Sequence, residues 1–429
     1  MKYLSKIFQV SLLLFLCACN TGSDSNDDDD ELPILILTDE VEVFEADLLH
    51  NNVVLAIENG GQAAYIIDKA GNKLFNWSFD TNLGNDLELL PNGYVIGMFR
   101  TDTPDFSFGG YGGVVKIIKP NNDIEWQYEY SSANYIAHHD VEILPNGNVV
   151  FLVWEKIDVA TAQAAGVNVT HDIYPEKLVE VNPANNQIVW EWRSWDHIIQ
   201  EFDNSKLNYG DVANNPQLVN INYSLVDNGD IMHANGIDHD STKDVIYISV
   251  NFFNEVWVID HSTTTAEAAT ATGGNYNKGG DLLYRFGNPS TYNNTQGDIL
   301  FDRNHFPNLI EDGKPGEGNM LIFVNGMSVE QSTVFELEMP DSFSLIPNTN
   351  NEPSVAWSFT DEELFYGRIS GANRLSNGNT LICEGDYGYW EVTPSGLIAW
   401  KYNGTGGSYW RGYDYDLDDP ALGSLGLSF

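Results

Sequence analysis

The sequence predicts an all-β fold, a six-bladed β-propeller, on three observations. Gly, Asn, Asp and aromatic residues are plentiful in this 429-residue chain, and such a composition favours strands joined by tight turns. A short aromatic strand motif recurs six times, and alternating hairpins precede most of its copies. Two hairpins make four strands in roughly 40 residues, which is the size of one propeller blade.

The N-terminal segment 1–18 is predicted to be a lipoprotein signal peptide. Lys2 and Lys6 precede an apolar run that is too short for a typical transmembrane helix. The run ends in Leu-Cys-Ala-Cys, which resembles the processing site of bacterial lipoproteins, with Cys19 as the lipidated first residue of the mature chain. An ordinary signal peptide with a chance cysteine is the alternative. We therefore expect export to the bacterial cell envelope, either the periplasm or the cell surface, and attachment through a lipid anchor.

Residues 19–32 are predicted to be a disordered acidic tether, because Asp and other polar residues dominate them. Residues 33–429 then form the propeller as a single domain. The net charge of −42 argues against nucleic acid or an anionic membrane surface as a partner, since both would repel the chain. The membrane is expected to be a partner only through the lipid anchor. The sequence leaves open whether the chain forms a homodimer.

Six repeats define the predicted blades. Each is expected to end in an outer strand with the aromatic motif, whose tryptophans fill the gap to the next blade. Two polar insertions, 196–231 and 260–281, are expected to cover one face as loops. The segment 33–44 is expected to close the ring as a strand added to another blade. The blades are predicted at residues 51–79, 86–130, 139–195, 233–287, 305–359 and 371–402.

In three repeats a histidine stands seven residues ahead of the inner hairpin turn: His139, His233 and His305. The same count gives Asn85 and Ser370 in two further blades. Because the innermost strands of a propeller line its central channel, these five side chains should meet on one face. The next strand returns to that face and should bring further side chains beside them: Arg100, Trp154, Asn251, Asn325 and Glu384.

The other histidines are expected to be structural. His138 should point away from His139, because neighbouring residues of a strand face opposite sides. The same structural role is expected of the remaining isolated histidines: His50, His171, His197, His239 and His261.

Three converging imidazoles allow more than one kind of chemistry. They could bind zinc or copper and leave one coordination position open. Alternatively, a neutral imidazole could act as a nucleophile while the others bind negative charge. The sequence has no serine elbow, phosphate-binding glycine loop or paired-cysteine motif, so serine hydrolysis, nucleotide use and thiol chemistry lack support. No cofactor and no metal are expected, and a metal-dependent hydrolase stays open as the less favoured alternative.

Several stretches carry a resemblance to a known family. They are FNEVWVIDHSTTTAEAA from Phe253, KGGDLLYRFGNP from Lys278, Asn304-His305 with FVNG from Phe323, and SGANRLSNGNTLICEGDYGYWEVTPSGLIAW from Ser370. They resemble the bacterial aryl-sulfate sulfotransferases, or arylsulfotransferases, and the resemblance covers most of the chain beyond its first 50 residues. It implies a six-bladed propeller that transfers a sulfuryl group from an aryl sulfate to a phenol, in a ping-pong reaction without a nucleotide donor.

The resemblance also implies roles for single residues. His305 would be the nucleophile that is transiently sulfated. His139, His233 and Asn235 would bind the sulfuryl oxygens.

This chain departs from the family pattern at two positions. Asn251 stands where an arginine is expected, and loss of that cation could cost about 3–4 kcal/mol of transition-state stabilisation. Arg100 is the candidate replacement, and Arg368 and Arg374 are weaker ones. Phe306 stands where a polar residue is expected. These departures keep a rival hypothesis open, namely a lipoprotein propeller that binds an anionic or aromatic ligand without catalysis.

Overall fold

Alternating apolar and polar residues, separated by turns rich in Gly, Asn and Asp, form 28 β-strands in the part of the chain that the structure describes. This is a computed structural model, and it describes residues 35–404 and 406–429. The predicted signal peptide, the predicted tether and Cys19 lie outside these residues. Residues 37–429 form one compact unit. None of the helices described in it is both long enough and apolar enough to cross a membrane.

The first sheet joins the beginning and the end of the compact unit. Its order is β28-β2-β3-β4, and all neighbours are antiparallel. The strands are β2 (Asn52–Glu58), β3 (Ala63–Ile67), β4 (Lys73–Ser78) and β28 (Tyr409–Asp416). The C-terminal strand β28, which lies beyond the last sequence repeat, thus supplies one edge of the sheet.

The largest sheet has nine strands, namely two antiparallel sets of four joined through the strand pair β5–β10, and the short strand β9. The first set is β5 (Leu83–Leu89), β6 (Val95–Arg100), β7 (Gly113–Ile118) and β8 (Ile124–Glu129). The second set is β10 (Tyr135–Ile143), β11 (Val149–Glu155), β12 (Glu176–Asn182) and β13 (Gln187–Arg193), with β9 (Ser131–Ser132) paired to β10. The two sets meet where His139 of β10 pairs in parallel with Asn85 of β5.

Two four-stranded antiparallel sheets follow, each in chain order. One contains β16 (Ala234–Asp240), β17 (Val245–Val250), β18 (Glu255–Asp260) and β19 (Tyr284–Phe286). The other contains β20 (Asn304–Leu309), β21 (Met320–Val324), β22 (Thr333–Glu338) and β23 (Ser354–Phe359). Their first strands place His233, directly ahead of β16, and His305, within β20, at corresponding positions.

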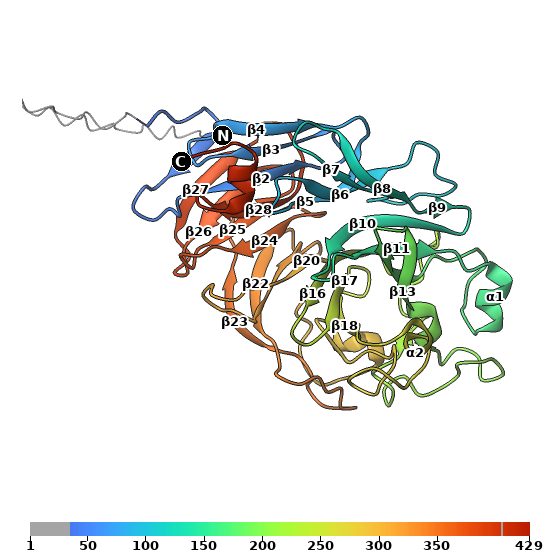
Figure 1. Cartoon of the computed structure of the whole chain (residues 1–429). Coiled ribbons are helices and arrows are strands. Elements are labelled where there is room, and N and C mark those ends of the chain that lie inside the picture. Colours follow the sequence, from blue (N-terminus) through green and yellow to red (C-terminus); the bar gives the residue numbers. More distant parts are fainter. Residues whose placement is uncertain (1–34, 405) are drawn as a thin grey trace, which may run out of the picture. The chain divides into compact units, whose positions relative to one another are not determined.

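The last sheet has the order β1-β27-β26-β25-β24. Its strands are β24 (Gly371–Arg374), β25 (Thr380–Glu384), β26 (Gly388–Val392), β27 (Ile398–Asn403) and β1 (Val41–Phe44). The antiparallel pairing of β1 with β27 agrees with the expectation that segment 33–44 adds a strand to another blade. Each end of the compact unit therefore completes a sheet formed mainly by the other end, and Figure 1 shows the blue and red strands side by side.

The helical elements are short, and most lie in the insertions between strands. They are α1 (Val159–Ala164), η1 (Ser194–His197), α2 (Thr265–Ala268), η2 (Pro289–Tyr292) and α3 (Pro420–Ser424). A two-stranded parallel sheet, β14 (Ile198–Ile199) with β15 (Val219–Asn220), lies in the insertion 196–231. His197 ties this insertion to 260–281, because its Nδ1 is 2.8 Å from Asp281 Oδ1 and its Nε2 is 2.7 Å from the Ala268 carbonyl.

The six aromatic motifs all lie on the last strands of their repeats, β4, β8, β13, β19, β23 and β27. Five of their tryptophans donate an indole N–H to the next set of strands. The pairs are Trp126 to Asn186 (2.8 Å), Trp190 to Thr263 (3.1 Å), Trp192 to the Gly280 carbonyl (2.8 Å), Trp357 to the Pro394 carbonyl (2.9 Å) and Trp400 to the Lys69 carbonyl (2.8 Å). These tryptophans join neighbouring sets of strands, as expected from the sequence.

The predicted all-β fold is confirmed, and the arrangement is propeller-like: four small sheets and one nine-stranded sheet. The predicted count of six blades does not appear sheet by sheet. The physical reason is the parallel pair between β5 and β10, which merges two sets of four strands into one sheet.

Candidate functional site

A pocket of about 470 Å³ lies beside β5, β10, β16 and β20. The three histidines that share one position in their repeats, His139, His233 and His305, line it. The imidazole centroids of His139 and His233 are 4.9 Å apart. Trp410 packs near His139 and His305, with its ring centroid 5.8 Å from that of His139 and 6.1 Å from that of His305. Three further residues expected from the sequence also line the pocket: Asn85, Arg100 and Asn251.

The backbone at the pocket is irregular in a repeated way. Strands β5, β10, β16 and β20 all shift their pairing register next to the pocket, as a β-bulge does. His139 (φ 54°), His233 (φ 51°) and Phe306 (φ 54°) adopt the left-handed conformation, which is uncommon for residues other than glycine. Such strain is concentrated at functional sites, where it aims side chains that a regular strand would direct elsewhere.

His305 is held in a single orientation by Asn325. The Nδ1 atom of His305 is 2.7 Å from Oδ1 of Asn325. The Asn325 amide is itself oriented, because its Nδ2 donates to the carbonyls of Tyr366 (2.7 Å) and Ile369 (2.9 Å). Oδ1 must then accept the proton of His305 Nδ1, which leaves a lone pair on Nε2. Burial lowers the pKa of His305 to about 3, so the imidazole is neutral at neutral pH.

A buried chain of three groups stands behind His139. Nδ1 of His139 is 2.8 Å from Nδ1 of His138, and Nε2 of His138 is 2.9 Å from Oε2 of Glu176. The expectation that His138 points away from His139 is therefore wrong. Strict alternation fails because the bulge in β10 and the left-handed φ of His139 turn the two rings toward each other.

The ionisation of this chain follows from its burial. Burial lowers the pKa of both imidazoles well below the usual value, and it raises the pKa of the Glu176 carboxyl well above its usual range. A protonated Glu176 donates to His138, which donates to His139. The Nε2–H of His139 is then available to the pocket.

His233 has the opposite electrostatics. Its Nδ1 is 2.5 Å from Oδ2 of Asp230. Burial alone would lower the pKa of His233, but the charge and hydrogen bond of Asp230 outweigh it, and the pKa is raised. The His233 ring stacks on Phe252, with centroids 4.8 Å apart, and the Arg303 guanidinium lies 4.5 Å from the centroid of the Phe252 ring. His233 is thus the imidazole of the pocket that is suited to carry a positive charge.

Arginines dominate the charge of the pocket. Arg100, Arg303 and the exposed Arg368 line it, and its lining among the described residues includes no carboxylate. In that same part of the chain, none of the three forms an ion pair. In a protein of net charge −42, three arginines without counter-ions define a site for an anion.

Arg303 occupies the region where the sequence pattern lacked a cation. Its Nη1 is 3.3 Å from Oδ1 of Asn251, the residue found in place of the expected arginine. Arg374, one of the candidate replacements, does not reach the pocket, because it is buried in an ion pair with Glu336. The positive charge expected from β17 is therefore delivered from the residue preceding β20.

Some residues expected at the site support it from outside the pocket lining. Asn235 is fully buried, and its Nδ2 donates to the Asn304 carbonyl at 2.8 Å, next to His305. Trp154 stacks on His138 with centroids 3.7 Å apart. Ser370 and Glu384 are buried and accept backbone N–H groups, from Gly385 and Phe365 respectively.

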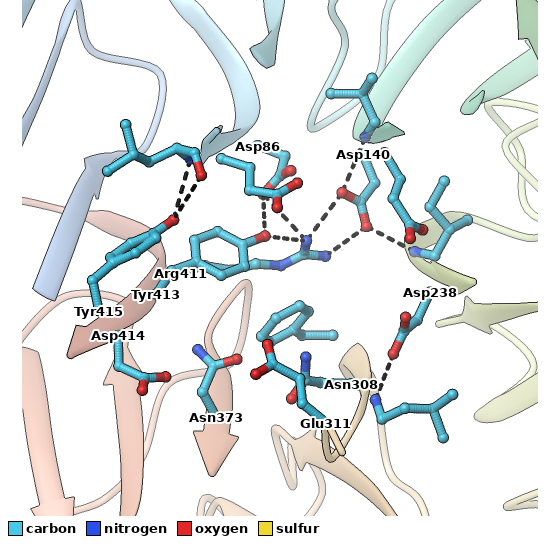
Figure 2. Close-up of a pocket in the computed structure, with 17 residues that line it drawn as sticks. Asp86, Asp140, Asp238, Asn308, Glu311, Asn373, Arg411, Tyr413, Asp414 and Tyr415 are labelled. Atoms are coloured by element: carbon cyan, nitrogen blue, oxygen red, sulfur yellow. Dashed lines mark hydrogen bonds and ion pairs between the residues drawn. The ribbon is translucent and has the colours of Figure 1, made fainter. Parts of the chain in front are cut away.

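A layer around Arg411 separates this pocket from a second one. The guanidinium of Arg411 binds both carboxylate oxygens of Asp140 at 3.0 Å and lies 3.2 Å from Asp86. Phe306 packs 4.1 Å from the guanidinium, which explains why an apolar residue follows His305. Figure 2 shows the second pocket, of about 250 Å³, with Asp86, Asp140, Asp238, Glu311 and Asp414 around it. Carboxyl groups thus crowd the second pocket, whereas none lines the histidine pocket among the described residues.

The residues that the sequence reasoning missed are Arg303, Asp230, Glu176 and the pair Trp410 and Arg411. Arg303 and Asp230 stand two and three residues ahead of His305 and His233. Inspection of the loops that precede these histidines could therefore have found them. Trp410 and Arg411 lie in the alternating aromatic run YWRGYDYD, which has the pattern of a strand. Glu176 had no sequence signal, because only the packing of β12 against β11 brings it to His138.

The chain resembles solved structures only weakly, but it matches one family model over most of its length. A protein of unknown function from Bacteroides caccae is 11% identical with a TM-score of 0.48, and the match covers 85% of this chain and 99% of that one. A putative 6-phosphogluconolactonase from Bacteroides fragilis NCTC 9343 is 10% identical with a TM-score of 0.43, over 85% and 98%. No curated protein sequence matches the chain. The sequence model of one family, described as Arylsulfotransferase (ASST), matches residues 39–403.

Proposed function

This chain belongs to the arylsulfotransferase family, and on that premise we propose that it transfers a sulfuryl group from an aryl sulfate to a phenol through a sulfated histidine, His305. The observation that carries the proposal is the uncompensated positive charge around a neutral imidazole. Three arginines that have no ion-pair partner among the described residues line the pocket that His305 enters. An anionic donor is attracted there, and the nucleophile remains unprotonated.

The first half-reaction begins at Nε2 of His305, whose lone pair attacks the sulfur of the aryl sulfate. The bond between sulfur and the phenolic oxygen breaks, and the electron pair leaves with the phenolate. The Nδ1–H of His305 stays bonded to Asn325, and this bond strengthens as positive charge develops on the ring. A neutral nucleophile held in one tautomer avoids both deprotonation and reorientation before attack.

The neighbouring groups stabilise charge that is spread over the sulfuryl oxygens in the transition state. Arg303 and Arg100 offer guanidinium N–H groups, and His233, protonated through Asp230, offers a charged N–H. Asn251 carries no charge itself, but its side-chain oxygen accepts from Arg303 and orients the guanidinium. Each such donor is worth about 10²–10³ in rate when it is aimed at developing charge in a site that excludes water.

His139 is proposed to stabilise the leaving phenolate. Its Nε2–H donates a hydrogen bond to the phenolic oxygen, which leaves as the phenolate and takes its proton from solvent. In the second half-reaction the acceptor phenol gives its proton to solvent, and the same N–H is bonded to the acceptor oxygen. The acceptor oxygen then attacks the sulfur, and His305 is released unchanged. Phe252, Met327 and Ile369 line the same pocket and suit the aromatic ring of either substrate. No cofactor takes part in this scheme.

We also propose the remaining features expected from the sequence. Counting β5–β8 and β10–β13 as separate blades, since one residue pair joins them, gives a six-bladed propeller. A lipid on Cys19 would hold the enzyme in the cell envelope, and homodimerisation is a question for sedimentation measurements. The rival function is a binding propeller that holds an anionic aromatic ligand in the same pocket.

Release of 4-nitrophenol from 4-nitrophenyl sulfate in the presence of phenol tests the proposal. We expect release and formation of phenyl sulfate by the wild type, and loss of both in His305→Ala. His171→Ala is the control, because that histidine bonds only to the Val226 carbonyl in the described structure. Tight binding of aryl sulfates without any turnover across a panel of donors and acceptors would favour the rival.

A further inference from the structure

A second histidine cluster lies at the end of β16 opposite to His233. Nδ1 of His261 is 2.8 Å from Oδ1 of Asp244, and Nε2 of His239 is 3.4 Å from the same oxygen. One ligand atom from each residue lies within 4.8 Å of the others, and among the described residues no other such group of three occurs. The cluster combines the end of β16, the turn into β17 and the residue after β18.

The spacing of these atoms suits a small metal ion. Zinc binds imidazole nitrogen and carboxylate oxygen at about 2.0–2.2 Å, so two ligands of a tetrahedral site lie about 3.4 Å apart. The His239–Asp244 distance already has this value, and the His261–Asp244 distance is shorter, as expected of a hydrogen bond. Small side-chain rotations would place the three atoms around one ion.

The surroundings of His261 favour it as a ligand through Nδ1. Its other nitrogen, Nε2, is 3.0 Å from Oε2 of Glu180 on β12. Glu180 is itself fixed, because its Oε1 accepts from the amides of Asn146 and Asn148. A carboxylate behind a ligating histidine fixes the tautomer and increases the basicity of the imidazole. This arrangement joins two neighbouring sheets at one point.

Access is also suitable for a metal. The side chains of His239 and His261 are 6% and 10% exposed, whereas that of Asp244 is 42% exposed. The imidazoles are thus held by packing, and the carboxylate opens the cluster to solvent. Asp244 has a φ of 53°, which the tight turn between β16 and β17 imposes, so its position is set by the backbone.

We propose that His239, Asp244 and His261 form a binding site for a divalent transition-metal ion, with zinc as the first candidate and water as its fourth ligand. Two histidines, one carboxylate and an open position are a common zinc set. The site lies outside the sulfuryl-transfer pocket, so its metal would act on the stability of the sheets rather than on the transfer. The chain then differs from the metal-free protein expected from the sequence.

The test uses the full-length protein, purified without a metal-affinity tag, stripped with EDTA and titrated with ZnCl₂ by calorimetry. We expect one zinc ion per chain and a higher Tm with zinc. Asp244→Asn and His239→Asn should abolish this binding, and Glu180→Gln should weaken it about 10–100-fold. His50→Asn is the matched control, because the His50 side chain pairs with Asp416 at 2.5 Å and lies outside the cluster.

Cobalt binding to the wild type gives a reading that does not depend on a folded variant. Co²⁺ in the site should show the visible absorption of a four-coordinate ion, and one equivalent of zinc should remove it. Zinc binding that persists in both Asp244→Asn and His239→Asn would place the ion elsewhere, for instance on the pocket histidines, and would overturn the proposal. Absence of stoichiometric zinc and cobalt binding by the wild type would overturn it as well.

Discussion

Removal of Arg303 tests the feature in which this pocket departs most clearly from the family pattern, namely a cation supplied by the residue that precedes β20. The guanidinium lies 3.3 Å from Asn251, stacks 4.5 Å over Phe252 and has no carboxylate partner among the described residues. Its whole charge is therefore available to the sulfuryl oxygens. Loss of one such donor costs about 2.7–4 kcal/mol of transition-state stabilisation, so Arg303→Ala should lower kcat roughly 10²–10³-fold. Arg303→Lys should recover part of this loss, because it keeps the charge but not the planar fork.

The assay is steady-state release of 4-nitrophenol with phenol as acceptor, together with circular dichroism to verify folding. Arg368→Ala, at the exposed rim of the same pocket, is the matched control and should lose less than about tenfold, because an exposed charge is screened by solvent. The double variant Arg303→Ala with Asn251→Arg should regain activity over Arg303→Ala alone. If Arg303→Ala keeps wild-type kcat, the cation at this position does not stabilise the transition state and the assignment is wrong.

Four further predictions concern His305 and the groups behind the pocket. Glu176→Gln should keep kcat within a few fold, because an amide N–H can replace a protonated carboxyl as donor, whereas Glu176→Ala should lower it strongly; equal losses would contradict a protonated Glu176. Asp230 raises the pKa of His233, so kcat/KM should fall as pH rises through that value, and Asp230→Asn should move this alkaline limb to lower pH, as a pH profile would reveal. Asn325→Ala frees the tautomer of His305 and leaves two buried carbonyls without donors, so both kcat and stability should fall, the latter by roughly 1–3 kcal/mol in chemical denaturation. Burial lowers the pKa of His305 to about 3, below its unfolded value of about 6.5, so the wild type should lose stability as pH falls through that interval, and His305→Gln should lose less.

The repeat pattern of the sequence predicts the strands and the histidine positions, because strand period and turn chemistry are local properties. His139, His233 and His305 follow from one rule of spacing and line one pocket. What the spacing could not predict depends on backbone irregularity. The bulge in β10 turns His138 toward His139, and no alternating pattern announces a left-handed residue.

Arg100 follows from the repeat count, but Arg303 and Arg411 were beyond local reasoning. A search at positions matched to β17 finds Asn251, whereas the charge comes from Arg303 in the loop that enters β20. Arg411 reaches the second pocket because the C-terminal strand completes the first sheet, a pairing between residues more than 300 apart in the chain. Such contacts depend on ring closure and leave no signal within one repeat.

Direct detection of the sulfated histidine tests the central proposal. The protein is mixed with 4-nitrophenyl sulfate without an acceptor, quenched at alkaline pH, and its peptides are analysed by mass spectrometry. We predict one added SO₃ on the peptide that carries His305, formed in step with a burst of 4-nitrophenol and lost when phenol is added. Turnover without this adduct, or an adduct on another residue, would contradict the role of His305.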